Sequence, residues 1–240
     1  FYIPGKAFIK LLIPMKMSEP IHVENMTYIV SLKDDNKQLQ YMYEGFINYN
    51  CSPHGEGILF SDKGLIVSIH GKFNNGNIDT KTCTIYYKHN DHVYNGSIDN
   101  KFKRHGYGKL CYSGDKNILT LESDWNNDLP SGTSKIIYSD GSIYTGTIVY
   151  MDNKPLPNGT GKISFSDNSE YLELYPNFGH NTFENTLNYK NGNKFTGNID
   201  LEYNKCPIFS GKGLFSYSDK NEIYESVESE WKIDKPIGKS

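Results

Sequence analysis

A glycine placed between two bulky residues recurs along this chain, and it restricts the possible folds more than any other feature. Residues 138–148 read YSDGSIYTGTI, in which Tyr144, Gly146 and Ile148 occupy every second position. Side chains two residues apart lie on the same face of a β-strand. Glycine weakens the interior of a strand unless another group needs the space beside it. The pattern therefore predicts strands in which an aromatic ring lies across the slot that the glycine leaves.

The pattern occurs in two versions that alternate along the sequence and define eight units of about 26 residues. The first version has a ring before the glycine and isoleucine after it, whereas the second mostly has an aliphatic residue first and an aromatic residue last. Large and small side chains on neighbouring strands would fill one face of a sheet without voids. The first version is Tyr43/Gly45/Ile47, Tyr94/Gly96/Ile98, Tyr144/Gly146/Ile148 and Phe195/Gly197/Ile199, and the second is Ile69/Gly71/Phe73, Leu121/Ser123/Trp125, Tyr171/Glu173/Tyr175 and Val227/Ser229/Trp231.

Each unit also has a second half with strand character. Alternating apolar residues such as Ile136 and Tyr138 lead into turns such as the Ser-Asp-Gly that follows Tyr138. Period-two alternation bounded by such turns indicates two short antiparallel strands in each unit. We therefore expect an all-β fold, a single-layer twisted antiparallel meander of about sixteen strands, elongated to about 75 Å at roughly 4.8 Å per strand. Four units carry a clear Gly-x-Gly in this half, at Gly55/Gly57, Gly106/Gly108, Gly159/Gly161 and Gly211/Gly213.

The order of Tyr-x-Gly-x-Ile, Gly-x-Gly and an aromatic-Ser-Asp-Gly turn resembles the MORN (membrane occupation and recognition nexus) repeat. The best match is KFKRHGYGKLCYSGD at 101–115, and the resemblance extends over residues 41–238. It implies a non-enzymatic scaffold whose partner proteins are cytoskeletal or lie at a membrane-apposed structure. Two alternatives stay open: a peripheral membrane adaptor for anionic lipid headgroups, and the non-catalytic part of a larger enzyme, because MORN repeats also occur beside kinase and methyltransferase domains.

We expect two regions in the chain. Residues 41–240 are predicted to form the repeat solenoid, whereas residues 1–40 lie outside the clear repeats. Apolar residues at Ile21, Val23 and 28–30 predict one or two further strands that cap the first unit. The alternatives are that this segment belongs to a neighbouring domain or pairs with another chain.

Charge and cysteine content limit the partners and the compartment. A formal net charge of −3 argues against nucleic acid, because neutralising phosphates needs a basic excess. The dispersed Cys51, Cys83, Cys111 and Cys206 form no CxxC pair, which favours free thiols in the cytoplasm. The family resemblance adds the cytoskeleton or a membrane as the place of association. Asn-x-Ser/Thr triplets leave secretion as the alternative.

The sequence offers candidates for binding but none for catalysis. No spacing typical of an activated nucleophile or of a closed metal site appears, so we expect no enzyme activity, metal or cofactor. The long groove and the edges of such a sheet suit other proteins or a second copy of the chain. The groove candidates are Phe73, Trp125, Tyr175 and Trp231.

One compact basic patch lies at a predicted hairpin tip and consists of Lys101, Lys103 and Arg104 around Phe102. Such a patch would bind phosphate or anionic lipid, with Phe102 as an apolar wedge. The alternative, which we favour, is an ordinary solvated turn.

Overall fold

The computed structural model describes residues 20–32, 37–61, 64–88, 91–178, 185–200, 207–218, 225–232 and 235–237, and all regular structure in this part of the chain is strand. The all-β prediction is thereby confirmed. The strands are β1 (Ile21–Leu32), β2 (Lys37–Ile47), β3 (Pro53–Phe60), β4 (Ile66–Asn74), β5 (Asn77–Tyr87), β6 (Val93–Ile98), β7 (Arg104–Cys111), β8 (Ile118–Asn126), β9 (Leu129–Tyr138), β10 (Ile143–Met151), β11 (Lys154–Ser164), β12 (Tyr171–Tyr175), β13 (Asn177–Phe178), β14 (Asn185–Tyr189), β15 (Lys194–Asp200), β16 (Ile208–Ser216), β17 (Ser226–Lys232) and β18 (Lys235–Ile237).

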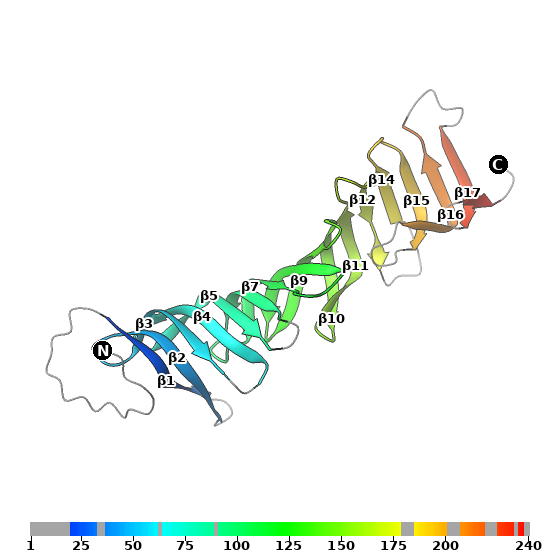
Figure 1. The fold of residues 1–240 in the computed structure, drawn as a ribbon. Helices are drawn as coiled ribbons and strands as arrows, with labels where there is room; N and C mark the ends of the chain where they lie inside the picture. Colours follow the sequence, from blue (N-terminus) through cyan, green and yellow to red (C-terminus); the bar gives the residue numbers. More distant parts are fainter. Residues whose placement is uncertain are drawn as a thin grey trace. The chain divides into compact units, whose positions relative to one another are not determined.

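The chain divides into two compact units, one of residues 1–114 with 124–129 (unit 1) and one of residues 115–123 with 130–240 (unit 2). In unit 1 the strands β1 to β7 pair antiparallel in sequence order, as Figure 1 shows in blue to cyan-green. In unit 2 antiparallel pairing runs from β9 through β12 and from β14 through β18, with β12 joined to β14. The predicted antiparallel meander is confirmed.

The first described strand extends the sheet beyond the clear repeats. Strand β1 pairs along its length with β2, interrupted by a bulge between Val23 and Met26. Asn25, within this bulge, has a φ of 57°. Residues 1–19 and 33–36 of the predicted N-terminal segment lie outside the described residues.

The inner face of the unit 1 sheet carries an unbroken row of core side chains. Cα partners across β2 to β7 join six large residues, none of them more than 1% exposed. The neighbouring row on the same face consists of five glycines and one cysteine. Because small residues adjoin large ones across the whole face, the sheet fills its own interior. The two rows are Tyr43, Leu59, Ile69, Ile85, Tyr94 and Leu110, then Gly45, Gly57, Gly71, Cys83, Gly96 and Gly108.

The glycines give room to the aromatic ring that begins each first-version motif. A Cβ added to Gly57 would lie 2.5 Å from Cε2 of Tyr43, too close for any side chain. The tyrosine hydroxyl in turn donates a 2.7 Å hydrogen bond to the carbonyl oxygen of Phe46, and burial raises the pKa of Tyr43 to about 12. The predicted ring across a glycine slot is confirmed. The same ring-over-glycine relation holds for Tyr94 with Gly108, Tyr144 with Gly161 and Phe195 with Gly213.

The tryptophans of the second-version motifs also pack on the inner face, against the glycine strands. The indole nitrogens of Trp125 and Trp231 donate 3.1 Å hydrogen bonds to the carbonyl oxygens of Gly108 and Gly213, respectively. Each indole also meets the motif ring edge-on, Trp125 against Tyr94 and Trp231 against Phe195. The glycine strand is therefore covered by a ring on its own hairpin and by one from the next.

The third second-version unit is not aligned as the motif suggests. Leu174 pairs with Ile163 and is fully buried, and Phe178 pairs with Gly159 as Phe73 pairs with Gly55. The residues that match Ile69/Gly71/Phe73 are therefore Leu174/Pro176/Phe178, three positions after the predicted Tyr171/Glu173/Tyr175. An odd shift moves a strand's side chains to the opposite face. Glu173 and Tyr175 belong to the outer face, whereas a bulge between Tyr171 and Glu173 pairs Tyr171 with Tyr189.

Candidate functional site

The predicted groove residues do not line an open groove. Phe73 and Trp125 are each 2% exposed and Trp231 is 9% exposed. Their rings fill the inner face, because they cover the glycine strands, and so they have no surface for a partner. Tyr175 lies instead on the outer face at 42% exposure, where its hydroxyl donates a 2.7 Å hydrogen bond to Glu173 Oε2. The groove interpretation is therefore corrected for all four residues.

Two residues of the predicted basic tip, Phe102 and Arg104, are buried and make contacts within unit 1. Phe102 is 3% exposed, with its ring 5.2 Å from that of Tyr41, so it is a core residue and not a wedge. Its backbone adopts a left-handed φ of 61° because the tip folds tightly around Asp99, whose carboxylate accepts the backbone N–H of Lys101 and of Lys103.

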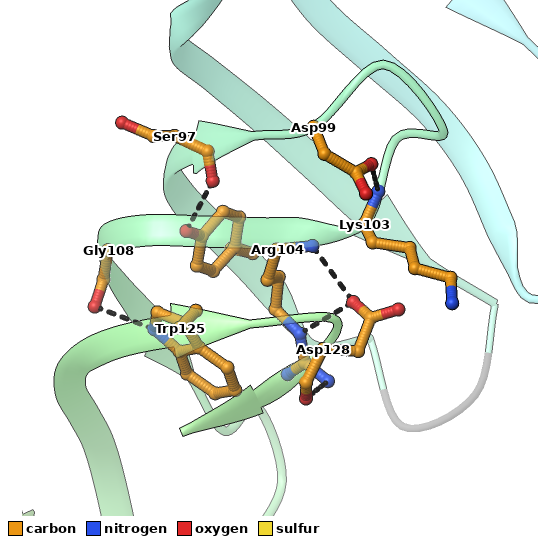
Figure 2. A network of polar contacts seen from close by, with 8 residues as sticks. Ser97, Asp99, Lys103, Arg104, Gly108, Trp125 and Asp128 are labelled. Atoms are coloured by element: carbon orange, nitrogen blue, oxygen red, sulfur yellow. Dashed lines mark hydrogen bonds and ion pairs between the residues drawn. The ribbon is translucent and has the colours of Figure 1, made fainter. Parts of the chain in front are cut away.

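Arg104 is held by the tip of the following hairpin. Its Nε lies 3.2 Å from Asp128 Oδ1, and its Nη2 donates a 2.9 Å hydrogen bond to the carbonyl oxygen of Asp128 (Figure 2). The guanidinium carbon lies 4.2 Å from the centre of the Trp125 ring, a distance typical of a cation–π contact. With its side chain 9% exposed, Arg104 anchors one hairpin to the next and does not present its charge to a ligand.

The outer face of unit 1 carries a row of side chains that the sequence did not single out. Consecutive Cα partners across β2 to β7 place six residues in register. Phe60 and Tyr86 are 36% and 39% exposed, and the Ser68 between them is 5% exposed. We call this the outer row of unit 1: Met42, Phe60, Ser68, Tyr86, Val93 and Cys111.

The corresponding row of unit 2 is polar from β11 onwards. Met42 and Val93 directly precede the ring of a first-version motif, and the residue that precedes Phe195 is Lys194. The row of unit 2 begins with two apolar residues on β9 and β10 and continues with polar residues on β11 to β17: Ile137 and Ile143, then Ser164, Glu173, Asn188, Lys194, Ser216 and Ser226. A polar row satisfies the fold from β11 to β17, so the apolar residues at these positions in unit 1 are not needed for the repeat architecture.

Other features of the described residues offer less chemistry. A shallow cleft of about 360 Å³ in unit 1 is lined by His54, Gly55, Lys72, Phe73, Asn74 and Asp79. No group of three or more His, Cys, Asp or Glu side chains suited to a metal ion occurs among the residues that the structure describes. In the same residues we find no helix capable of crossing a membrane. Cys51, Cys83 and Cys111 are free thiols, and Cys206 lies outside the described residues.

The outer row can be recognised in the sequence only when the repeats are aligned and equivalent positions are compared. The residue before each first-version ring is Met42, Val93, Ile143 or Lys194, so the column changes from apolar to charged along the chain. A single motif shows only the usual alternation of a strand. The difference between units, and not the motif itself, marks the surface.

The comparison with family models agrees with the repeat. The family model "MORN repeat" matches residues 103–116, which include the Gly106/Gly108 pair of β7. No curated protein matches the sequence. Among solved structures, the chain is similar to the SAS-4 (dCPAP) TCP domain of Drosophila melanogaster, solved in complex with a proline-rich motif of Ana2 (dSTIL), at 17% identity over 71% of this chain and 82% of that chain, with a TM-score of 0.29. Residues 103–116 are thus a MORN repeat, and the chain is consistent with a MORN repeat protein.

Proposed function

We propose that this protein is a non-enzymatic scaffold that binds another protein through the outer row of unit 1. The family match supports a scaffold role in protein or membrane binding. The observation that carries the choice of a protein partner is the contrast between the two outer rows. Phe60 and Tyr86 are exposed in the row of unit 1, whereas the same row carries charged, amide and hydroxyl side chains on β11 to β17 of unit 2. Contiguous apolar surface of this kind marks contact sites, and aromatic residues are enriched in protein interfaces.

The filled inner face supports the same choice. Phe73, Trp125 and Trp231 already cover the glycine strands, so a partner would have to displace core rings to enter there. The outer row needs no such rearrangement, because Phe60 and Tyr86 are already exposed. Binding to a preformed surface avoids the cost of reorganisation.

Affinity capture of the full chain from its native cells, read by mass spectrometry, tests this proposal. The informative variant is Phe60→Ser with Tyr86→Ser, which removes the two exposed rings of the row. The matched control is Tyr175→Ser with Leu214→Ser, because these outer-face residues of unit 2 are 42% and 39% exposed. We expect a protein, a second copy of the chain included, to be recovered with the wild type and the control and lost with the Phe60/Tyr86 variant. Equal recovery in all three would refute the proposal.

A further inference from the structure

We propose that the partner at the outer row of unit 1 is a second copy of this chain, stacked face to face about a two-fold axis. This inference rests on the proposed function, since it names the partner of that same surface. The six strands β2 to β7 follow one another in order, so a two-fold axis that runs parallel to the strands, midway between the two sheets and over the β4–β5 pair, places β2 opposite β7, β3 opposite β6 and β4 opposite β5. Two sheets packed in this way lie about 10 Å apart.

Large side chains meet small ones in this arrangement. Tyr86 of one copy faces the position of Ser68 in the other, where Ser68 is small, 5% exposed and in contact with His70, and lies between two exposed rings of its own row. Phe60 faces Val93. Because each of these contacts occurs twice, one patch fits itself, as a two-fold interface requires. Interdigitation of large and small residues is the packing found where two sheets form a common core.

The charges beside the row favour the same orientation. A second outer row, adjacent to the first, runs through Glu44, Ile58, His70, Thr84, Asn95 and Lys109. Its acidic end is on β2 and its basic end on β7, so the two-fold axis brings Glu44 of each copy to Lys109 of the other. Stacking without this reversal would place Glu44 against Glu44, an arrangement that like-charge repulsion disfavours.

Two aromatic residues next to the charged pair would also face each other across the axis. Phe46 lies two residues after Glu44 on β2, and Tyr107 lies two residues before Lys109 on β7, so both are on the outer face. They are 40% and 62% exposed, and the axis places each opposite the other. At the other side of the patch the first row continues on β1 with Thr27, an exposed polar residue, which limits the apolar contact to β2–β7.

The size of the patch predicts a reversible dimer. Six strands at roughly 4.8 Å by three rows give roughly 500 Å² per copy, or roughly 1,000 Å² in total, at the lower limit of specific interfaces. We therefore expect dissociation constants on the order of 10–100 µM.

Sedimentation equilibrium of the purified full chain, from about 1 to about 300 µM, tests the inference. We expect Glu44→Lys and Lys109→Glu each to weaken association about tenfold, because each change affects two symmetric contacts. The double variant Glu44→Lys/Lys109→Glu should return to within about threefold of wild type, because it restores opposite charges across the axis. Lys194→Glu in the outer row of unit 2 is the matched control and should leave association unchanged.

Each outcome decides between the two proposals. A chain that is monomeric throughout, or a double variant that stays as weak as the single variants, overturns the second copy as partner. If that monomeric chain still captures a different protein that the Phe60/Tyr86 variant loses, the scaffold function stands and only the identity of its partner is refuted. If the Phe60/Tyr86 variant loses nothing, both are refuted.

Discussion

Replacing Gly108 by alanine tests the packing of a ring over glycine most sharply. A Cβ at this position would lie 2.5 Å from Cε2 of Tyr94, whereas carbon atoms in contact are about 3.5–4.0 Å apart. The ring would have to move by about 1 Å, but it is completely buried and its hydroxyl is fixed by a 2.8 Å hydrogen bond to the carbonyl oxygen of Ser97. Overpacking costs about 1–3 kcal/mol and the weakened hydrogen bond about 1 kcal/mol, so we expect a loss of about 2–4 kcal/mol.

Urea denaturation followed by tryptophan fluorescence measures this loss, with Trp125 reporting on unit 1 and Trp231 on unit 2. Gly114→Ala is the control, because Gly114 has a φ of 77° but nothing within 4 Å of an added Cβ. It should cost only the backbone strain of about 1 kcal/mol. In a Tyr94→Leu background the Gly108→Ala change should cost less than in the wild type, since the ring is gone. A loss at Gly108 no larger than at Gly114, or equal losses in both backgrounds, would refute the reasoning.

Three further predictions concern the interior. Trp125→Ala and Trp231→Ala should each cost about 3–5 kcal/mol in denaturation, because each removes a buried indole and leaves a cavity; a loss under about 1 kcal/mol would contradict this. Asp128→Ala should cost about 1–3 kcal/mol, because it removes acceptors for the buried Arg104, and the Arg104→Ala change should cost less in that background. Burial, aided by Asp79, raises the pKa of Cys83 from 9.0 to about 12. The unfolded thiol therefore loses its proton first, so stability should fall as pH rises from 9 towards 12, and Cys83→Ala should flatten the onset of that fall.

The sequence predicted the architecture because local rules and packing agree in most repeats. The spacing of Tyr144, Gly146 and Ile148 specifies a strand, a shared face and a slot, and the structure places the ring in that slot. The OH group is not required for this packing, since Phe195 occupies the same position and stacks on Phe209 at 4.0 Å instead. Patterns that depend only on neighbouring residues were therefore readable.

The exposure of individual side chains could not be predicted from the sequence, because it depends on which residues of other strands cover them. Trp125 resembles a groove residue in sequence, but the Arg104 guanidinium and the Gly108 carbonyl bury it. Tyr175 was assigned to the wrong face because the residues from Tyr171 still alternate as a strand would. Pro176 stands where the motif has a glycine, so the sequence at the true position does not match the motif. The outer row appears only from register across several strands, which no single motif contains.

Hydroxyl-radical footprinting of two tyrosines tests the central claim, that the outer row of unit 1 is the contact surface. Tyr86 in that row and Tyr175 in unit 2 are 39% and 42% exposed in the isolated chain, so their intrinsic labelling is closely matched. The measurement compares the full chain in concentrated native extract with the dilute purified chain. The account predicts that Tyr86 becomes protected in the extract while Tyr175 does not. Unchanged labelling of Tyr86, or equal protection of both, would contradict it.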